Sequence, residues 1–262
     1  MTAARPEPSR APIPRAAMVL AAGYGRRMQP LTALRPKPLI EVMGRPLIVR
    51  ILMHLAEVGV AHAVVNTHYL AEKLHTRLAG HRQPEVTMIH EAEGLLDTGG
   101  GVANALDRLG DQPFYVLNGD VFWLDGYTPA LARLAAAWDD SRMDALLLMA
   151  PTAWAIGYEG AGDFQLDIAG QARRRQELEV APCAFTGIQI LHPRLFAEAP
   201  AGAFSLNRLY DTAAAAGRLY GLVHDGLWFH IGTPGDLDLA EAVLEDMGFR
   251  HESLPEDAPA PP

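Results

Sequence analysis

The sequence predicts an α/β fold, a Rossmann-like three-layer sandwich with a mostly parallel central sheet and a small β-rich elaboration. Three observations predict it. Between residues 17 and 150, short apolar runs alternate with amphipathic stretches in a repeating strand–helix order. The apolar runs are continuous, which is typical of strands that helices cover on both faces. After about Pro151, glycine-separated polar and aromatic segments indicate a hairpin or meander.

The expected elements follow in order along the chain. Strands are expected over residues 17–22, 62–67, 85–91, 113–120 and 143–150, and helices over 46–59, 70–80, 100–110 and 128–140. Gly59 and Gly80 stand where the first two helices should stop. The second part is expected to hold a hairpin within 154–175, strands over 183–191 and 218–224, a short segment over 227–233, and helices near 205–217 and over 234–248.

Length and composition bound the domain organisation. A chain of 262 residues, 49% hydrophobic and 20% charged, can bury one large core. We therefore expect residues 17–249 to form a single domain, with 17–150 and 151–249 as its two halves. The segments 1–16 and 250–262 are rich in proline, and we expect a disordered leader and a disordered tail there.

Charge and cysteine content argue against several functions. A formal net charge of -9 opposes general nucleic-acid binding, which needs clustered positive charge. The one cysteine, Cys183, cannot form an internal disulfide, and no Cys/His spacing is typical of zinc. No apolar run approaches the roughly 20 residues of a membrane span. We therefore expect a cytoplasmic protein without membrane or nucleic-acid partners, in which a local basic pocket could still hold a small anion.

A glycine loop follows the first expected strand. Gly23 and Gly25 lack side chains, so that backbone N–H groups could approach phosphate oxygens. Arg26 and Arg27 come next, and a guanidinium binds phosphate through two parallel hydrogen bonds. The loop has neither the third glycine of the dinucleotide fingerprint nor the spacing of a P-loop. A tight turn without a ligand is the alternative.

Lys37 stands out by rarity and by its neighbours. The chain has only two lysines, Lys37 and Lys73, against twenty arginines. Pro36 and Pro38 flank Lys37 and restrict the local backbone, which could hold its ammonium near a target. The alternative is a solvated lysine in a surface loop.

An aspartate ends the apolar run 113–120. Because this run is an expected parallel strand, Asp120 should lie at the carboxyl end of the sheet, where ligands of such folds bind. A single carboxylate with phosphates and waters suits Mg²⁺. The alternative is an aspartate that closes a turn.

The segment LAAGYGRRMQPLTALRPKPL, residues 20–39, resembles the signature of the sugar-phosphate nucleotidyltransferases. The resemblance extends to TGGGV at 98–102, NGD at 118–120, FTGIQIL at 185–191 and WFHIGTP at 228–234. It covers residues 17–248 and implies the nucleotide-diphospho-sugar transferase fold, with 17–150 as the nucleotide-binding half and 151–249 as the sugar-binding half.

The resemblance implies an enzyme in which a sugar 1-phosphate oxygen attacks the α-phosphorus of a nucleoside triphosphate and expels pyrophosphate. It implies that Arg27 holds the pyrophosphate, that Lys37 bridges the attacking phosphate and the α-phosphate, and that Asp120 binds Mg²⁺, with Mn²⁺ as an alternative. The nucleotide-binding residues that it implies are Leu20, Ala21, Ala22, Gly23, Gly25, Thr98, Gly99 and Gly100.

The chain departs from the family pattern at two places. Where the family has a second metal-binding aspartate, this chain has His230, so that the second ligand is lost, is His230 itself, or is replaced by Asp236 or Asp225. A Glu-Lys-Pro segment of the family is also missing, and the arginines of ARRRQ, residues 172–176, are either its substitute or a solvated edge. The sugar-binding residues that the resemblance implies are Asn118, Glu179, Thr186 and Gly187.

The resemblance also predicts the substrates. The chain is short, and its segments LDTGGG at 96–101, NGDVFW at 118–123 and Gly-Thr-Pro at 232–234 are most similar to those of the members that transfer a uridylyl group from UTP to N-acetylmuramate 1-phosphate in bacterial cell-wall recycling. The alternatives are guanylyl- or thymidylyltransferases of mannose, heptose or glucose 1-phosphate, or a non-catalytic module that binds nucleotide sugars. A monomer or weak homo-oligomer is expected.

Overall fold

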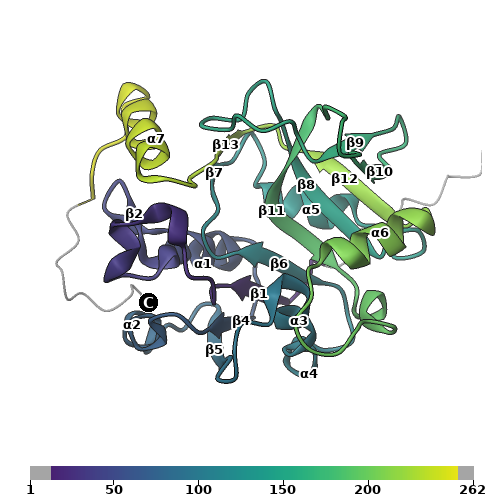
Figure 1. Cartoon of the computed structure of the whole chain (residues 1–262), viewed down its shortest axis with the longest axis horizontal. Coiled ribbons are helices and arrows are strands. Elements are labelled where there is room, and N and C mark those ends of the chain that lie inside the picture. Colours follow the sequence, from purple (N-terminus) through teal and green to yellow (C-terminus); the bar gives the residue numbers. More distant parts are fainter. Residues whose placement is uncertain (1–12, 253–262) are drawn as a thin grey trace, which may run out of the picture.

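The computed structural model describes residues 13–252. Most of the expected leader and tail therefore lies outside the described residues. The described part forms a mixed central sheet with helices on both faces, which confirms the α/β fold (Figure 1).

The central sheet has nine strands. Four of them are parallel neighbours in the order β6-β1-β4-β5, and β11 joins β6 in the antiparallel sense. Beyond β11 lie β8 and then β12, which is parallel to β8, while β9 and β10 form a hairpin on the end of β11. The strands are β1 (Ala16–Leu20), β4 (His62–Thr67), β5 (Glu85–His90), β6 (Phe114–Asn118), β8 (Ala145–Pro151), β9 (Phe164–Leu166), β10 (Ala172–Arg174), β11 (Cys183–Leu191) and β12 (Leu219–Val223).

Helices cover both faces of this sheet, because its strands carry apolar side chains on both faces. Along β1, Ala17 and Val19 belong to the core on one face, and Met18 belongs to the core on the other. The first core is closed by α1 (Leu47–Glu57), α2 (Ala71–Leu78) and α5 (Ala130–Ala137); the second is closed by α3 (Asp97–Ala103), α4 (Leu106–Leu109) and α6 (Asn207–Ala215) (Figure 1).

A third core cluster packs residues between 28 and 47 against the last described helix. Helix α7 (Pro234–Asp246) packs near the two-residue strands β2 (Glu41–Val42) and β3 (Arg45–Pro46), and β13 (Leu227–Phe229) pairs with β7 (Phe122–Leu124). Thr233 caps α7, since its side chain accepts a hydrogen bond from Asp236 N–H.

One expectation about local structure was wrong. The helix expected over 100–110 is split into α3 and α4, and α3 begins earlier, at Asp97. The break lies at Asn104 and Ala105, where the Ala105 N–H donates to Val102 O in a tighter three-residue turn. Three short 3₁₀ helices for which no element was expected lie at Arg26–Met28, Leu31–Ala33 and Lys37–Leu39, and a fourth follows β11 at Pro193–Phe196.

Candidate active site

A cavity of about 520 Å³ lies at the carboxyl ends of β1, β4 and β6. We call it the main cavity. This edge of the sheet is where loops turn into helices and ligands of open α/β folds bind. Its walls are Leu20, Ala21, Ala22, Gly23, Gly25, Arg26, Arg27, Met28, Lys37, Pro38, Asn66, Glu91, Leu95, Asp97, Thr98, Asn118, Asp120 and Gly232.

The glycine loop forms one wall of the main cavity and packs against the lysine segment. Gly25 has a left-handed backbone with a φ of 62°. A Cβ at this position would lie 3.0 Å from the Lys37 Cβ and 3.0 Å from the Thr32 Cγ2. Glycine is therefore needed both for the turn and for the close approach of the two segments. Arg26 and Arg27 follow in a 3₁₀ helix and also line the cavity.

Lys37 and Asp120 form an ion pair inside the main cavity. The Lys37 Nζ lies 2.5 Å from the Asp120 Oδ2, and the two side chains are 13% and 35% exposed. Pro36 and Pro38 hold Lys37 at the start of a 3₁₀ helix. Asp120 follows β6 after a turn in which the Gly119 N–H donates to Leu20 O at 2.8 Å. Segments 83 residues apart thus place a cation and a carboxylate side by side, and Arg27 lines the same cavity.

His230 lies beside this group of charges. A Cβ on Gly232, which lines the cavity, would lie 2.8 Å from the His230 Nε2 and 3.5 Å from the Arg27 Nη1. Burial lowers the pKa of His230, and the positive charges of Lys37 and Arg27 lower it further against the opposing effect of Asp236 and Asp120. The imidazole is therefore held in its neutral form, which is the form that can bind a metal.

The two other aspartates expected as replacement ligands have other partners. The Asp236 Oδ2 accepts the N–H groups of Gly232 and Thr233 at 3.0 and 2.8 Å, as part of the cap of α7. Asp225 pairs with Arg133 at 2.6 Å and does not line the main cavity.

Of the three nucleotide-binding residues expected at 98–100, one lines the main cavity. Thr98 lines the main cavity, whereas Gly99 and Gly100 do not. The N–H groups of both glycines already donate to Phe204 O, at 2.8 and 3.1 Å. A Cβ on Gly99 would lie 2.3 Å from the Phe204 ring, so this glycine admits a neighbouring loop rather than a base.

The residues expected to bind the sugar fall into three environments. Asn118 lines the main cavity, and a Cβ on Gly187 would lie 2.8 Å from its Nδ2, so Gly187 contacts Asn118 without lining the cavity itself. Thr186 is buried, and its hydroxyl donates to Leu148 O at 2.8 Å, away from the cavity. Glu179 lies outside the main cavity and accepts two hydrogen bonds from Arg173, which lower the pKa of its carboxyl.

Sequence reasoning missed a buried polar pair in the cavity wall. Asn66 is the last residue but one of β4, its Oδ1 accepts the Ala21 N–H at 2.8 Å, and its Nδ2 donates to the Glu91 Oε1 at 2.6 Å. The other Glu91 oxygen accepts the Leu96 N–H at 2.9 Å. Both side chains are buried and line the main cavity. The signal was present, because polar residues at the carboxyl ends of neighbouring parallel strands should converge.

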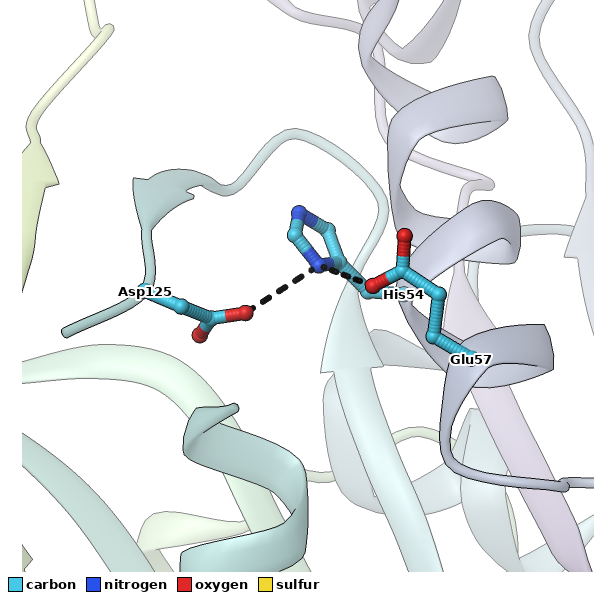
Figure 2. Close-up of side chains that lie close together, drawn as sticks. All are labelled: His54, Glu57 and Asp125. Carbon is cyan, nitrogen blue, oxygen red and sulfur yellow. Dashed lines mark ion pairs between the residues drawn. The ribbon is translucent and has the colours of Figure 1, made fainter. Parts of the chain in front are cut away.

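Outside the main cavity, three titratable side chains converge between α1 and the chain after β7 (Figure 2). The His54 Nδ1 lies 3.4 Å from the Asp125 Oδ2 and 3.6 Å from the Glu57 Oε2, and its ring stacks on Trp123. Burial alone would raise the pKa of Asp125, but hydrogen bonds from His54, the Ala130 N–H and the Trp123 indole lower it. The cluster fastens α1 to the segment that follows Asp120.

The chain belongs to the nucleotidyl transferase family, whose sequence model matches residues 16–158. Among curated proteins, the N-acetylmuramate alpha-1-phosphate uridylyltransferase of Caulobacter vibrioides is 41% identical over 237 residues, which are 89% of this chain and 98% of that protein. The protein of the same name from Neisseria meningitidis serogroup B is 33% identical over 230 residues, 87% and 97% of the two chains. The family resemblance seen in the motifs is thus confirmed.

More distant relatives agree on the fold. The mannose-1-phosphate guanylyltransferase catalytic subunit beta of Danio rerio is 27% identical over 253 residues, 93% of this chain and 66% of that protein. A solved UDP-glucose pyrophosphorylase in complex with UDP-glucose superposes with a TM-score of 0.75 at 15% identity, covering 89% of this chain and 99% of the other. At that identity the likeness establishes the shared architecture.

None of the helices within residues 13–252 is long and apolar enough to cross a membrane.

Proposed function

We propose that the protein transfers a uridylyl group from UTP to N-acetylmuramate α-1-phosphate, giving the UDP-sugar and pyrophosphate. The relatives at 41% and 33% identity carry this activity in their names and match nearly their whole length. The observation on which the proposal depends most is the Lys37–Asp120 pair in one cavity with Arg27. Binding a nucleotide sugar without reaction would not need a buried cation and a carboxylate at the same point.

The reaction joins two polyanions, so charge neutralisation is its main requirement. A phosphate oxygen of the sugar 1-phosphate forms a bond to the α-phosphorus, and the bond from that phosphorus to the bridging oxygen of pyrophosphate breaks, its electron pair leaving with pyrophosphate. The Lys37 ammonium offsets charge on the attacking phosphate and on the α-phosphate. Arg27, on the glycine loop, binds the departing pyrophosphate through paired N–H groups.

A divalent cation fits the residues of the main cavity. The Asp120 carboxylate faces the cavity, and only its Oδ2 has a hydrogen-bond partner among residues 13–252, so Oδ1 is available as a hard oxygen ligand for Mg²⁺ or Mn²⁺. When bound, such an ion would neutralise triphosphate charge. The neutral imidazole of His230 is a second candidate ligand and suits Mn²⁺ better than Mg²⁺.

The proposed setting is bacterial cell-wall recycling in the cytoplasm, with small-molecule substrates and a monomeric or weakly associated enzyme. The relatives named for this reaction support the substrate assignment.

Pyrophosphate release tests the proposal. The purified protein is mixed with Mg²⁺ or Mn²⁺, one of UTP, GTP, dTTP or CTP, and one of several sugar 1-phosphates: N-acetylmuramate, N-acetylglucosamine, mannose and glucose. We expect the highest kcat/KM with UTP and N-acetylmuramate 1-phosphate. A preference for GTP and mannose 1-phosphate would replace this assignment with a guanylyltransferase, and no release with any pair would favour a binding module.

The metal role of Asp120 has its own test. Asp120→Asn should lower kcat and raise the metal concentration needed for half-maximal rate, because the ligand loses its charge. Asp225→Asn is the matched control, since this aspartate pairs with Arg133 away from the cavity. An unchanged metal titration in Asp120→Asn would contradict the assignment.

A further inference from the structure

A second pocket, of about 510 Å³, lies in the half of the chain after residue 151. Two arginines, two acids, two phenylalanines and an amide line it, and we call it the arginine pocket. The residues that carry the argument are Asp163, Arg174, Arg175, Glu177, Phe185 and Asn207.

Strand β11 runs from beside the main cavity to the arginine pocket. This strand is antiparallel to β6 and pairs with it only from Ile188 onward, with Ile188 opposite Leu117. Residues 183–187 therefore continue past the carboxyl end of β6, the edge that carries Asn118 and Asp120. Gly187 packs on Asn118, which lines the main cavity. Phe185, two strand residues or about 7 Å further on, lines the arginine pocket, and this length is comparable with the breadth of a sugar ring.

A second connection leads from one pocket to the other. The Leu206 N–H donates to the Thr98 Oγ1 at 3.0 Å, and Thr98 lines the main cavity. The next residue, Asn207, begins helix α6 and lines the arginine pocket. Two chain connections, along β11 and through Leu206, thus lead from residues beside Asp120 to residues that line the arginine pocket.

The guanidinium of Arg175 is fixed in place by neutral groups. Its Nε donates to Gly162 O at 2.7 Å, and its Nη1 donates to the carbonyl groups of residues 176, 177 and 179 at 3.1 to 3.3 Å. Within residues 13–252, no carboxylate lies within 4 Å of it. Its positive charge is therefore uncompensated by a direct ion pair, although its position is set.

Arg174 brings a second guanidinium, of which only Nη1 has a hydrogen-bond partner among the described residues. Its Nη1 binds the Asp211 Oδ2 at 2.7 Å on an exposed surface, and its other N–H groups have no acceptor among the described residues. The acids of the pocket oppose an anion less than their number suggests. The Asp163 Oδ2 accepts the Phe185 N–H at 2.9 Å, and Glu177 is exposed and screened by water.

We propose that the arginine pocket binds a carboxylate carried by the sugar of the sugar 1-phosphate. This rests on the proposed function, in which that sugar is N-acetylmuramate, an N-acetylglucosamine bearing a lactic acid ether on its 3-hydroxyl. Arg174 donates two parallel N–H groups to the lactyl carboxylate from its Nε and Nη2, which have no acceptor among the described residues, and Arg175 adds its positive charge and its Nη2. Asn207, at the positive end of α6, adds a polar contact.

Specificity follows from this arrangement. N-acetylglucosamine 1-phosphate has the same ring, acetamido group and phosphate but no carboxylate, so it gains nothing from the two arginines. The main cavity then binds the phosphate and ring that both sugar 1-phosphates share, and the arginine pocket binds the carboxylate that only N-acetylmuramate 1-phosphate has.

The test compares both acceptors with each variant, in single-turnover reactions with enzyme in excess so that a slow acceptor is still measured. Arg174→Ala should reduce the wild-type preference for N-acetylmuramate 1-phosphate at least about tenfold and leave the rate with N-acetylglucosamine 1-phosphate within about twofold. Asp211→Asn should strengthen the preference, because it releases Arg174 from a competing carboxylate. Arg208→Ala is the matched control, since Arg208 is exposed on α6 and lies outside the pocket.

Arg175→Lys keeps the charge and removes the Nη2 donor, so it should also weaken the preference. Its melting temperature shows whether the loop that Arg175 holds is intact. Equal losses with both acceptors, or no loss in Arg174→Ala, would overturn the inference while leaving the proposed function in place. A wild-type protein that does not use N-acetylmuramate 1-phosphate would overturn both.

Discussion

Replacing Gly187 with alanine crowds Asn118, which lines the main cavity, without touching a charged group. Gly187 lies where the register of β11 against β8 shifts between Phe185 and Gln189, and its φ is 85°. An added Cβ would lie 2.7 Å from the Val121 Cγ1 and 2.8 Å from the Asn118 Nδ2. Something must move, and Asn118 is the more flexible neighbour.

The expected loss of stability in Gly187→Ala has two contributions. A left-handed backbone costs a residue with a Cβ roughly 1–2 kcal/mol. Crowding in a packed wall adds roughly 1–3 kcal/mol. Gly59→Ala separates them, because Gly59 has a similar φ of 81° but no atom within 4 Å of the added Cβ. The crowding part should therefore appear as the difference between the two variants.

Urea denaturation gives the free energy of unfolding, and steady-state kinetics give the effect on the site. We expect Gly187→Ala to be less stable than Gly59→Ala by roughly 1–3 kcal/mol, and to raise the KM for the sugar 1-phosphate while Gly59→Ala leaves it unchanged. Equal stability of the two variants together with an unchanged KM would refute the placement of Gly187 against Asn118.

Two further predictions concern buried polar groups. Asn66→Ala should lower the free energy of unfolding by roughly 2–4 kcal/mol in urea denaturation, since it leaves the buried Glu91 oxygen and the Ala21 N–H without partners; a loss below about 0.5 kcal/mol would contradict this. Burial lowers the pKa of His224, so the unfolded chain binds this proton before the folded chain does as the pH drops. The free energy of unfolding should therefore fall as the pH drops below about 6.5, by up to about 1.4 kcal/mol per pH unit for this group. His224→Gln should show a shallower fall between about pH 7.5 and 5.5, and a slope equal to that of the wild type would contradict this prediction.

Periodicity predicted most of the fold because burial on both faces leaves a strong signal. The strand expected over 62–67 matches β4 at both ends, and the helix expected over 46–59 ends just before Gly59, whose φ is positive. What the sequence concealed were short elements fixed by tertiary contacts. The three 3₁₀ helices between Arg26 and Leu39 and the pairing of β7 with β13 have no period of their own.

The same distinction holds for the candidate site. Gly25, Lys37 and Asp120 were recognisable because their motifs are local, and the structure brings the segments that carry them to one cavity. The role of Gly99 was not readable, since it depends on Phe204, about a hundred residues away. Likewise, Thr186 resembles a ligand-binding residue in sequence, but its hydroxyl binds Leu148 O in the sheet.

The most direct measurement is the turnover of Lys37→Ala beside Lys73→Ala, with UTP binding measured separately on both. Lys37 is mostly buried against Asp120, whereas Lys73 is exposed on α2, so the pair controls for the loss of a lysine. If the ammonium offsets charge that develops during transfer, kcat should fall by roughly 10²–10³ in Lys37→Ala with a much smaller change in UTP affinity, and Lys73→Ala should match the wild type. A kcat in Lys37→Ala equal to that of Lys73→Ala would contradict the account.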